Sequence, residues 1–393
     1  MADPVVEVRF RAAELMACLG PAAAVHADGV AALLGDTGAR TTRQRETVGE
    51  AALWALARMN DPRCLPGLVE LIAGGPSGFA SNSAHRPASD WHRPVLPAPY
   101  EALLCLPEHA DVLMPAIRDR LHPATRQDLL RSLCEVLAHW GAAAEPAVPH
   151  LVNLLDDDAT WVPAATALSG IGTAGFGTTG VSTAGGSTAG GSTAGVGTPG
   201  IGTGGGGAAG TRVLDTLAGR FGSGGNEAEL AAWTYWRVGG DPEPALDLLG
   251  AAITADRFVH TALRRLADLG PRAACLTDRL RVLAASTDSW TGVEAAHALW
   301  ATTGDTGTAV PVLTKAVQAL PGGTYLPVML PAVRHLTRIG VAARPAASLL
   351  ADVDGLDQRL RNSGGRRGFT QDESIRTAID ELLVATAGIT RNG

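Results

Sequence analysis

Apolar residues along this chain recur at the spacing that places them on one face of a helix. Two consecutive stripes at positions i, i+3, i+4 and i+7 are Leu133, Val136, Leu137, Trp140 and then Val148, Leu151, Val152, Leu155. Gly141 follows the first stripe and can adopt the left-handed conformation that ends a helix. Pro146 and Pro149 mark the start of the second, where the N–H that proline lacks would be unpaired anyway. The pattern therefore predicts an antiparallel helix pair.

The same unit recurs further along the chain. Residues 231–249 (AAWTYWRVGGDPEPALDLL) and 295–313 (AAHALWATTGDTGTAVPVL) align without a gap at a shift of 64 positions. The turn glycines step by 30, 34 and 36 positions, and they are Gly240, Gly270, Gly304 and Gly340. Periods of this size are typical of stacked supersecondary units, none of which can bury its apolar face alone.

The repeat predicts an all-α fold, an α-solenoid superhelix of about nine antiparallel helix pairs. We expect the pairs at residues 4–34, 41–73, 97–121, 123–155, 157–221, 226–252, 256–285, 288–320 and 322–353. A last helix at about 370–387 would cover the end of the array.

A low-complexity segment interrupts the array. Residues 170–211 are rich in Gly, Thr, Ser and Ala and carry no charge, which favours a flexible insert. It either separates two domains or lies within one repeat's turn. We favour the turn, because excising 173–207 leaves LSGIGAAGTRVLDTLAGRF, an ordinary helix–turn–helix unit. The predicted organisation is thus N-terminal repeats (1–169, with an irregular loop at 74–97), the insert (170–211), and C-terminal repeats with the final helix (212–393).

Composition and charge exclude only a few classes of function. Aromatic residues make up 4% of the chain and apolar residues 46%, so Ala, Leu and Val must form the core. The net charge of −7 gives no global basic surface for nucleic acid. Lys315 is the single lysine, a bias that indicates a GC-rich bacterial genome. The N-terminus lacks the apolar block of a signal peptide, and no apolar run is long enough to span a membrane.

Cysteine usage favours a reducing compartment. Five cysteines occur without a CxxC pair, and most lie within apolar helical patterns: Cys18, Cys64, Cys105, Cys134 and Cys275. We interpret most of them as buried thiols of a cytoplasmic protein.

The helix pair with a Gly or Gly-Asp turn, an early proline in the second helix and an Asp-rich exit resembles HEAT repeats. The segment DDDATWVPAATALSGIG (156–172) is similar to the start-of-repeat pattern of the bacterial HEAT-like family named after phycobilin (PBS) lyases. Pro163 departs from that pattern, because the family often has arginine after Trp-Val. The resemblance covers the chain apart from 74–97 and 173–207. It implies a solenoid from a bacterial, specifically actinobacterial, source and leaves the function open.

Motifs for catalysis are missing from the sequence. It contains no Walker A motif, no GxSxG and no HExxH, and none of the ten histidines is followed by Glu. The last point argues against a di-iron hydroxylase resembling the HEAT-repeat deoxyhypusine hydroxylases, which use His-Glu dyads. The GxGxxG matches in the insert follow a helix instead of a strand, so they do not indicate a nucleotide site. We therefore predict no catalytic, cofactor-binding or metal-binding residues.

One loop carries ligand-type side chains without a ligand motif. His85, Asp90 and His92 lie in the Pro-rich stretch 74–99, and their spacing matches no known metal site. We interpret this stretch as a solvated loop. Trp91 within it either holds the loop against the solenoid or anchors a partner.

The candidate partner-binding residues are aromatic or basic side chains expected at the surface: Trp91, Trp161, Trp290, Arg359, Arg361, Arg366 and Arg367. The other helical tryptophans fall near the ends of first helices and are interpreted as core residues: Trp54, Trp140, Trp236 and Trp300. The four arginines surround a Gly-rich bend that can bind a phosphate or an acidic partner, or simply be solvated. A second basic face can form near the N-terminus from Arg9, Arg11, Arg40, Arg43 and Arg45.

These features favour a non-enzymatic scaffold that binds another protein along the concave surface of the solenoid, lined by second helices. One alternative is an enzyme or accessory of the phycobilin-lyase-like class. The other is nucleic-acid binding through the arginine clusters, which the net charge disfavours. No cofactor and no membrane partner are expected, and the oligomeric state stays open.

Overall fold

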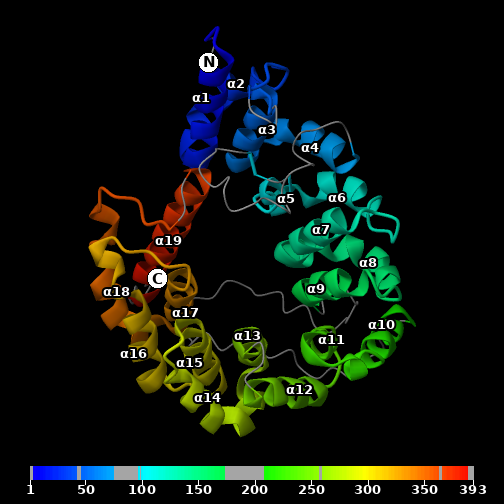
Figure 1. Cartoon of the computed structure of the whole chain (residues 1–393), viewed down its shortest axis with the longest axis vertical. Helices are drawn as coiled ribbons and strands as arrows, with labels where there is room; N and C mark the ends of the chain where they lie inside the picture. Colours follow the sequence, from blue (N-terminus) through cyan, green and yellow to red (C-terminus); the bar gives the residue numbers. More distant parts are fainter. Residues whose placement is uncertain are drawn as a thin grey trace, which may run out of the picture. The chain divides into compact units, whose positions relative to one another are not determined.

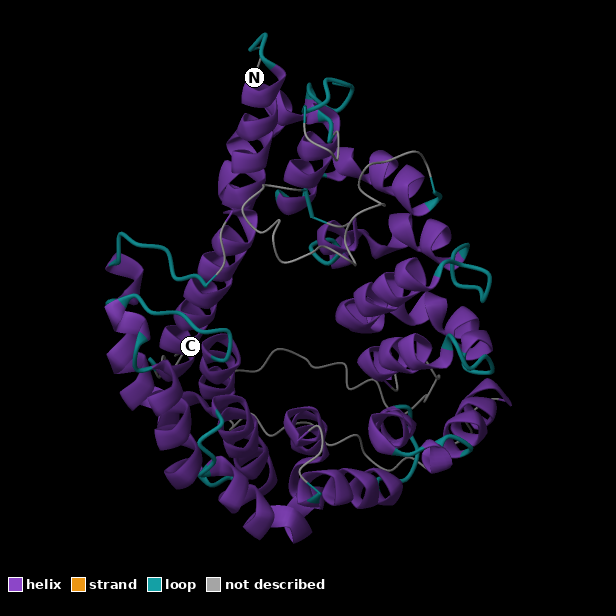
Figure 2. Cartoon of the chain, viewed as in Figure 1, coloured by secondary structure: helices purple, strands orange, loops and turns teal. Residues whose placement is uncertain are grey.

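The described parts of the chain are built from successive helices joined by turns (Figures 1 and 2). The computed structural model describes residues 3–41, 46–74, 96–97, 99–172, 208–255, 259–362 and 365–387. Within these ranges the structure contains helices and turns, with one isolated antiparallel bridge between Ala39 and Thr47 and no β-strand. The predicted all-α solenoid class is confirmed. None of the described helices is long and apolar enough to cross a membrane.

The chain divides into two compact units. Unit 1 comprises the described residues within 1–177, 206–219 and 237–240, and unit 2 those within 220–236 and 241–393. The helices of unit 1 are α1 (Val6–Leu19), α2 (Ala27–Ala31), α3 (Val48–Arg58), α4 (Leu65–Ile72), α5 (Pro99–Leu103), α6 (Ala110–Arg118), α7 (Gln127–Trp140), α8 (Val148–Leu154), α9 (Trp161–Ile171) and α10 (Ala208–Ala218). Those of unit 2 are α11 (Gly225–Arg237, its last residue in unit 1), α12 (Glu243–Thr254), α13 (Val259–Leu269), α14 (Thr277–Ala284), α15 (Ser289–Thr303), α16 (Thr306–Val317), α17 (Met329–Ile339), α18 (Arg344–Leu350) and α19 (Gly365–Thr386).

Turn chemistry explains how the pair α7 and α8 reverses direction. Gly141 has a φ of +57°, and its N–H bonds to the carbonyl of Leu137, which ends α7. A 3-10 turn, Gly141–Ala147, then leads into α8, whose first turn contains Pro149. Two helices occupy the range of each predicted pair, and α19 begins at Gly365 instead of about 370.

Unit 2 has two layers of helices. The first helices α13 and α15 contact each other extensively, whereas α15 and α17 contact each other at few points, as do the second helices α14, α16 and α18. Figure 1 shows α13, α15 and α17 in one layer and α14, α16 and α18 in the other. In Figure 1 the layer of α13, α15 and α17 lies on the inner side of the arc that unit 2 forms, so first helices line the concave side of this unit. The prediction that second helices do so is wrong here.

Helices α9 and α10 belong to the same unit although the low-complexity insert separates them. The insert, residues 173–207, lies outside the described residues, and its place within one repeat's turn stays a prediction. Replacing it by a linker of about four residues should preserve the helical circular dichroism. It should leave the free energy of unfolding unchanged or raise it by at most about 2 kcal/mol, because closing a shorter loop costs less entropy. Loss of the unit 1 unfolding transition in urea would contradict the prediction.

Candidate functional site

A cluster of ionisable side chains lies within the Ala- and Leu-rich core of unit 2. Glu294 and His297 are three positions apart on α15, so they share one face of that helix. His335 comes from α17, the first helix of the next pair. The three residues are only 1%, 6% and 7% exposed, respectively. We refer to Glu294, His297 and His335 as the buried triad.

The triad is held by contacts from three helices. His335 Nε2 lies 3.3 Å from Glu294 Oε2, and the Nε of Arg264 on α13 donates to Glu294 Oε1 at 2.8 Å. Arg338 Nη1 lies 3.4 Å from His297 Nε2. The two imidazole rings stack face to face, with centroids 3.7 Å apart and planes 9° apart.

Two polar atoms of the triad have no hydrogen-bond partner. The Glu294 carboxylate only accepts, so His335 Nε2 carries the proton that it donates. The Arg338 guanidinium only donates, so His297 Nε2 is the acceptor in that contact. The Nδ1 atoms of both rings are buried and have no hydrogen-bond partner. An unpaired buried polar atom costs on the order of 1–3 kcal/mol, so the two Nδ1 atoms require an explanation.

Burial keeps both imidazoles neutral at neutral pH. Desolvation, together with His335 and Arg338, lowers the pKa of His297 to about 2. Desolvation also lowers the pKa of His335, although Glu294 opposes the shift. Burial alone would raise the pKa of Glu294, but hydrogen bonds and charges from His335 and Arg264 outweigh it and lower that pKa. The triad is therefore one carboxylate beside two neutral imidazoles.

Two basic side chains that contact the triad, Arg264 and Arg338, reach the surface of the protein. The side chain of Arg264 is 52% exposed, and its Cζ lies 5.6 Å from the ring centroid of Trp290. Arg338 and Arg334 are both exposed and lie one turn apart on α17. We call Arg264, Arg334, Arg338 and Trp290 the basic rim. Arg264 is paired with Glu294, so the positive charge of the rim comes from Arg334 and Arg338, on a chain whose net charge is −7.

The triad carries no short sequence motif, whereas Trp290 of the rim was predicted from its position at a helix start. Trp290 was a candidate partner-binding residue, and it lies half-buried beside Arg264. The two histidines are 38 positions apart, so no short motif joins them. The available signal was their place in the repeat, because His297 and His335 precede the turn glycines Gly304 and Gly340 by seven and five positions.

The other tryptophans lie mainly in the core. Trp161 is 2% exposed, so the expectation that its side chain is partly exposed is wrong. Trp54, Trp140 and Trp236 are buried, as predicted, and Trp300 is half-buried against the core. Trp91 lies outside the described residues, as do His85, Asp90 and His92.

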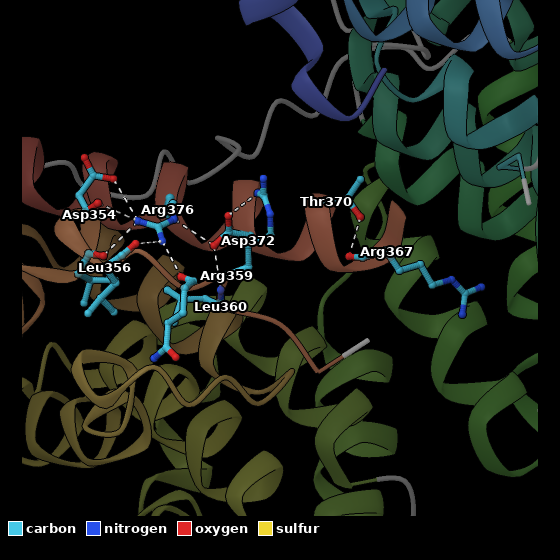
Figure 3. A network of polar contacts seen from close by, with 10 residues as sticks. Asp354, Leu356, Arg359, Leu360, Arg367, Thr370, Asp372 and Arg376 are labelled. Atoms are coloured by element: carbon cyan, nitrogen blue, oxygen red, sulfur yellow. Dashed lines mark hydrogen bonds and ion pairs between the residues drawn. The ribbon is translucent and has the colours of Figure 1, made fainter. Parts of the chain in front are cut away.

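At the Gly-rich bend, Arg359 contacts neighbouring side chains, whereas Arg367 points away from them (Figure 3). Arg359 bonds to Asp372 at 3.0 Å and lies over the ring of Phe369 at 3.9 Å. Arg376 holds the same bend through Asp372 and four main-chain carbonyls (Figure 3). In Figure 3 the side chain of Arg367 points away from this network. Arg361 is exposed, and the side chain of Arg366 lies outside the described residues.

The second basic face predicted near the N-terminus does not form from the described arginines. Arg9 pairs with Asp36 at 2.7 Å, and Arg11 pairs with Glu14 at 2.6 Å. Arg40 is buried between carboxylates, 2.9 Å from Glu7 and 3.4 Å from Glu46. These pairs neutralise the arginine charges. Arg43 and Arg45 lie outside the described residues.

The cysteines follow the prediction for most positions. Cys18, Cys64 and Cys134 are buried free thiols, Cys105 is half-buried, and Cys275 is exposed. Burial raises the pKa of Cys64 and Cys134 to about 12, so both stay protonated and unreactive at neutral pH.

Fold and site together define a helical-repeat protein of the solenoid class. No protein-family model matches the sequence, and no curated protein sequence matches it significantly. Two similar solved structures are an engineered protein of the Northeast Structural Genomics Consortium (19% identity, 96% of this chain and 97% of that chain, TM-score 0.35) and yeast importin-beta (10% identity, 91% and 46%, TM-score 0.30). The fold assignment itself rests on the packing of the helix pairs.

Proposed function

We propose that this protein is a non-enzymatic scaffold whose first-helix layer in unit 2 binds an acidic segment of another protein. The observation that carries the proposal is the basic rim. Its three arginines come from α13 and α17, and Trp290 comes from α15 between them. A layer of this kind offers one continuous surface over successive repeats, which suits extended partners.

The chemistry of the rim supports an acidic protein partner. Arginine and tryptophan are enriched at binding hot spots. A guanidinium group can form two parallel hydrogen bonds to one carboxylate, and the indole ring offers a large rigid surface. Nucleic acid is the weaker candidate, since carboxylates pair with Arg9, Arg11 and Arg40 of one predicted basic cluster and with Arg359 of the other. We also propose that the protein is a member of the PBS-lyase-like HEAT family, that it comes from an actinobacterium, and that it is located in the cytoplasm. Within the described ranges, no arrangement of side chains that we identify supports an enzymatic role of the phycobilin-lyase-like kind.

Photo-crosslinking in the native host tests this proposal. Lys315 is the single lysine, so amine-reactive crosslinkers are unsuitable. A photoreactive amino acid in place of Trp290 should crosslink one acidic protein, whereas the same group in place of Lys315, exposed on the second helix α16, should not. Equal labelling of partners from both positions would argue against a binding face at the rim.

Charge reversal supplies the quantitative test. Arg334→Glu combined with Arg338→Glu should weaken binding of the crosslinked partner at least tenfold, because two rim cations become repulsive. The matched control is Arg281→Glu with Lys315→Glu, which reverses two charges on α14 and α16 and should leave the affinity within about twofold. If the captured species is nucleic acid, removed by nuclease, the protein-scaffold proposal fails.

A further inference from the structure

We propose that the buried triad is a zinc-binding site that links two successive repeats. Glu294 and His297 on α15 and His335 on α17 would supply three ligands, with water as the fourth. Within the described residues, this is the group of three such side chains whose ligand atoms lie within 4.8 Å of one another. The inference does not depend on the proposed scaffold function.

The spacing of Glu294 and His335 already suits a metal ion. Their 3.3 Å separation is slightly longer than ordinary N–H···O hydrogen bonds, which are about 2.7–3.2 Å. It matches the distance between two ligands of a tetrahedral zinc ion, about 3.3 Å for bonds of about 2.0–2.1 Å. Zinc can therefore replace the shared proton between these two atoms, while the ring proton of His335 moves to its unpaired Nδ1.

His297 requires one local movement. A metal bond lies in the plane of an imidazole ring, and two rings stacked 9° from parallel cannot both direct a lone pair at one ion. Rotation of His297 about its χ2 torsion, which has broad minima, would turn a ring nitrogen toward the ion. Zinc binding is thus expected to break the His297–His335 stack and to alter the contact of His297 with Trp300, whose ring centroid lies 5.9 Å away.

The charges around the triad permit a zinc ion to replace the proton between Glu294 and His335. Arg264 and Arg338 both contact the triad, and a divalent ion would repel them. Both arginines extend to the surface, where they can turn outward into water. Both imidazoles are neutral, so zinc need not displace a proton from an imidazolium ion. The negative charge of Glu294 then balances half of the zinc charge.

A zinc titration of the full chain tests the site. After dialysis against a chelator, the wild-type protein should take up one zinc ion per chain in competition with a chromophoric chelator. Bound zinc should also raise the thermal unfolding midpoint, because it binds the folded state alone. Glu294→Gln and His297→Gln should each weaken zinc binding more than tenfold. Cobalt in place of zinc should show the visible absorption of a tetrahedral nitrogen–oxygen site.

Two controls make the outcome specific. His139→Gln removes an exposed histidine of α7 and should change nothing. His85→Gln with His92→Gln removes the loop histidines and should leave the stoichiometry at one. The proposal is overturned if the wild-type chain takes up no zinc, a result that requires no variant to fold. It is equally overturned if binding survives in His297→Gln or disappears in the loop variant.

Discussion

Replacing Gly170 with alanine is expected to lower the free energy of unfolding of unit 1 by about 3 kcal/mol. Gly170 lies on α9, where that helix crosses α7 at Ala138. An added Cβ would lie 2.6 Å from the Cα of Ala138 and even closer to its carbonyl oxygen. These are backbone atoms, so no side chain can rotate aside and the two helices must separate. Their shared core then loses close packing along both helices.

A second glycine provides a matched control of opposite sign. Gly210 lies on α10, and a Cβ added there meets no atom within 4 Å. Gly210→Ala should raise the free energy of unfolding by roughly 0.5 kcal/mol, since alanine loses less backbone entropy in a helix. Urea titrations monitored by circular dichroism measure both variants. Equal midpoints for Gly170→Ala and wild type would show that α7 and α9 do not approach this closely.

Acidification between about pH 6.5 and 4.5 is expected to destabilise the protein strongly. Unfolded His297 takes up a proton below its ordinary pKa of 6.5, whereas the folded side chain, with a pKa of about 2, does not. Stability is therefore present above pH 6.5 and is lost as the pH falls, by about 1.4 kcal/mol per unit, or about 3 kcal/mol over this window. His335, and to a smaller extent the less buried His150, have lowered pKa values and act in the same direction.

Between about pH 6.5 and 4.5, the contribution of these histidines to stability changes, whereas that of the carboxylates stays nearly constant. Several Asp and Glu side chains also have lowered pKa values, among them Asp36, Asp288 and Glu294. Such groups stabilise the fold above their ordinary values near 4 and lose that contribution only at lower pH. Losses above pH 4.5 therefore report mainly on the buried imidazoles.

Unfolding in urea at several pH values, with a chelator present, measures the effect. His297→Gln should reduce the slope of stability against pH by about 1.4 kcal/mol per unit, whatever its effect on stability at pH 7. His139→Gln, which removes an exposed histidine, should run parallel to wild type. Parallel curves for His297→Gln and wild type would mean that His297 is not held neutral by burial.

Local pattern was sufficient to predict the helix pairs. The apolar stripe ending at Trp140 and the glycine after it determine where α7 stops, because both act through neighbouring residues. The same holds for the turn at Gly340, which ends α17 with a φ of +71°. Periodicity and turn glycines are local signals, and repeats amplify them by repetition.

The candidate site depended on contacts between repeats. The sequence shows Glu294 and His297 on one helix face, but nothing in it places His335 beside them, because that meeting depends on how α17 packs against α15. Burial of Trp161 likewise depends on neighbouring helices that cover its face.

Pairing of charges was also decided by tertiary structure. Arg40 and Glu7 are 33 positions apart, so their ion pair, which removes an expected basic face, could not be inferred from local sequence. The sequence by itself determined the helices, their turns and the solenoid class, since these follow from interactions within about one turn of helix. Only the stacking of repeats decided which layer lines the concave side of unit 2, which cations remain exposed there, and which histidines meet in its core.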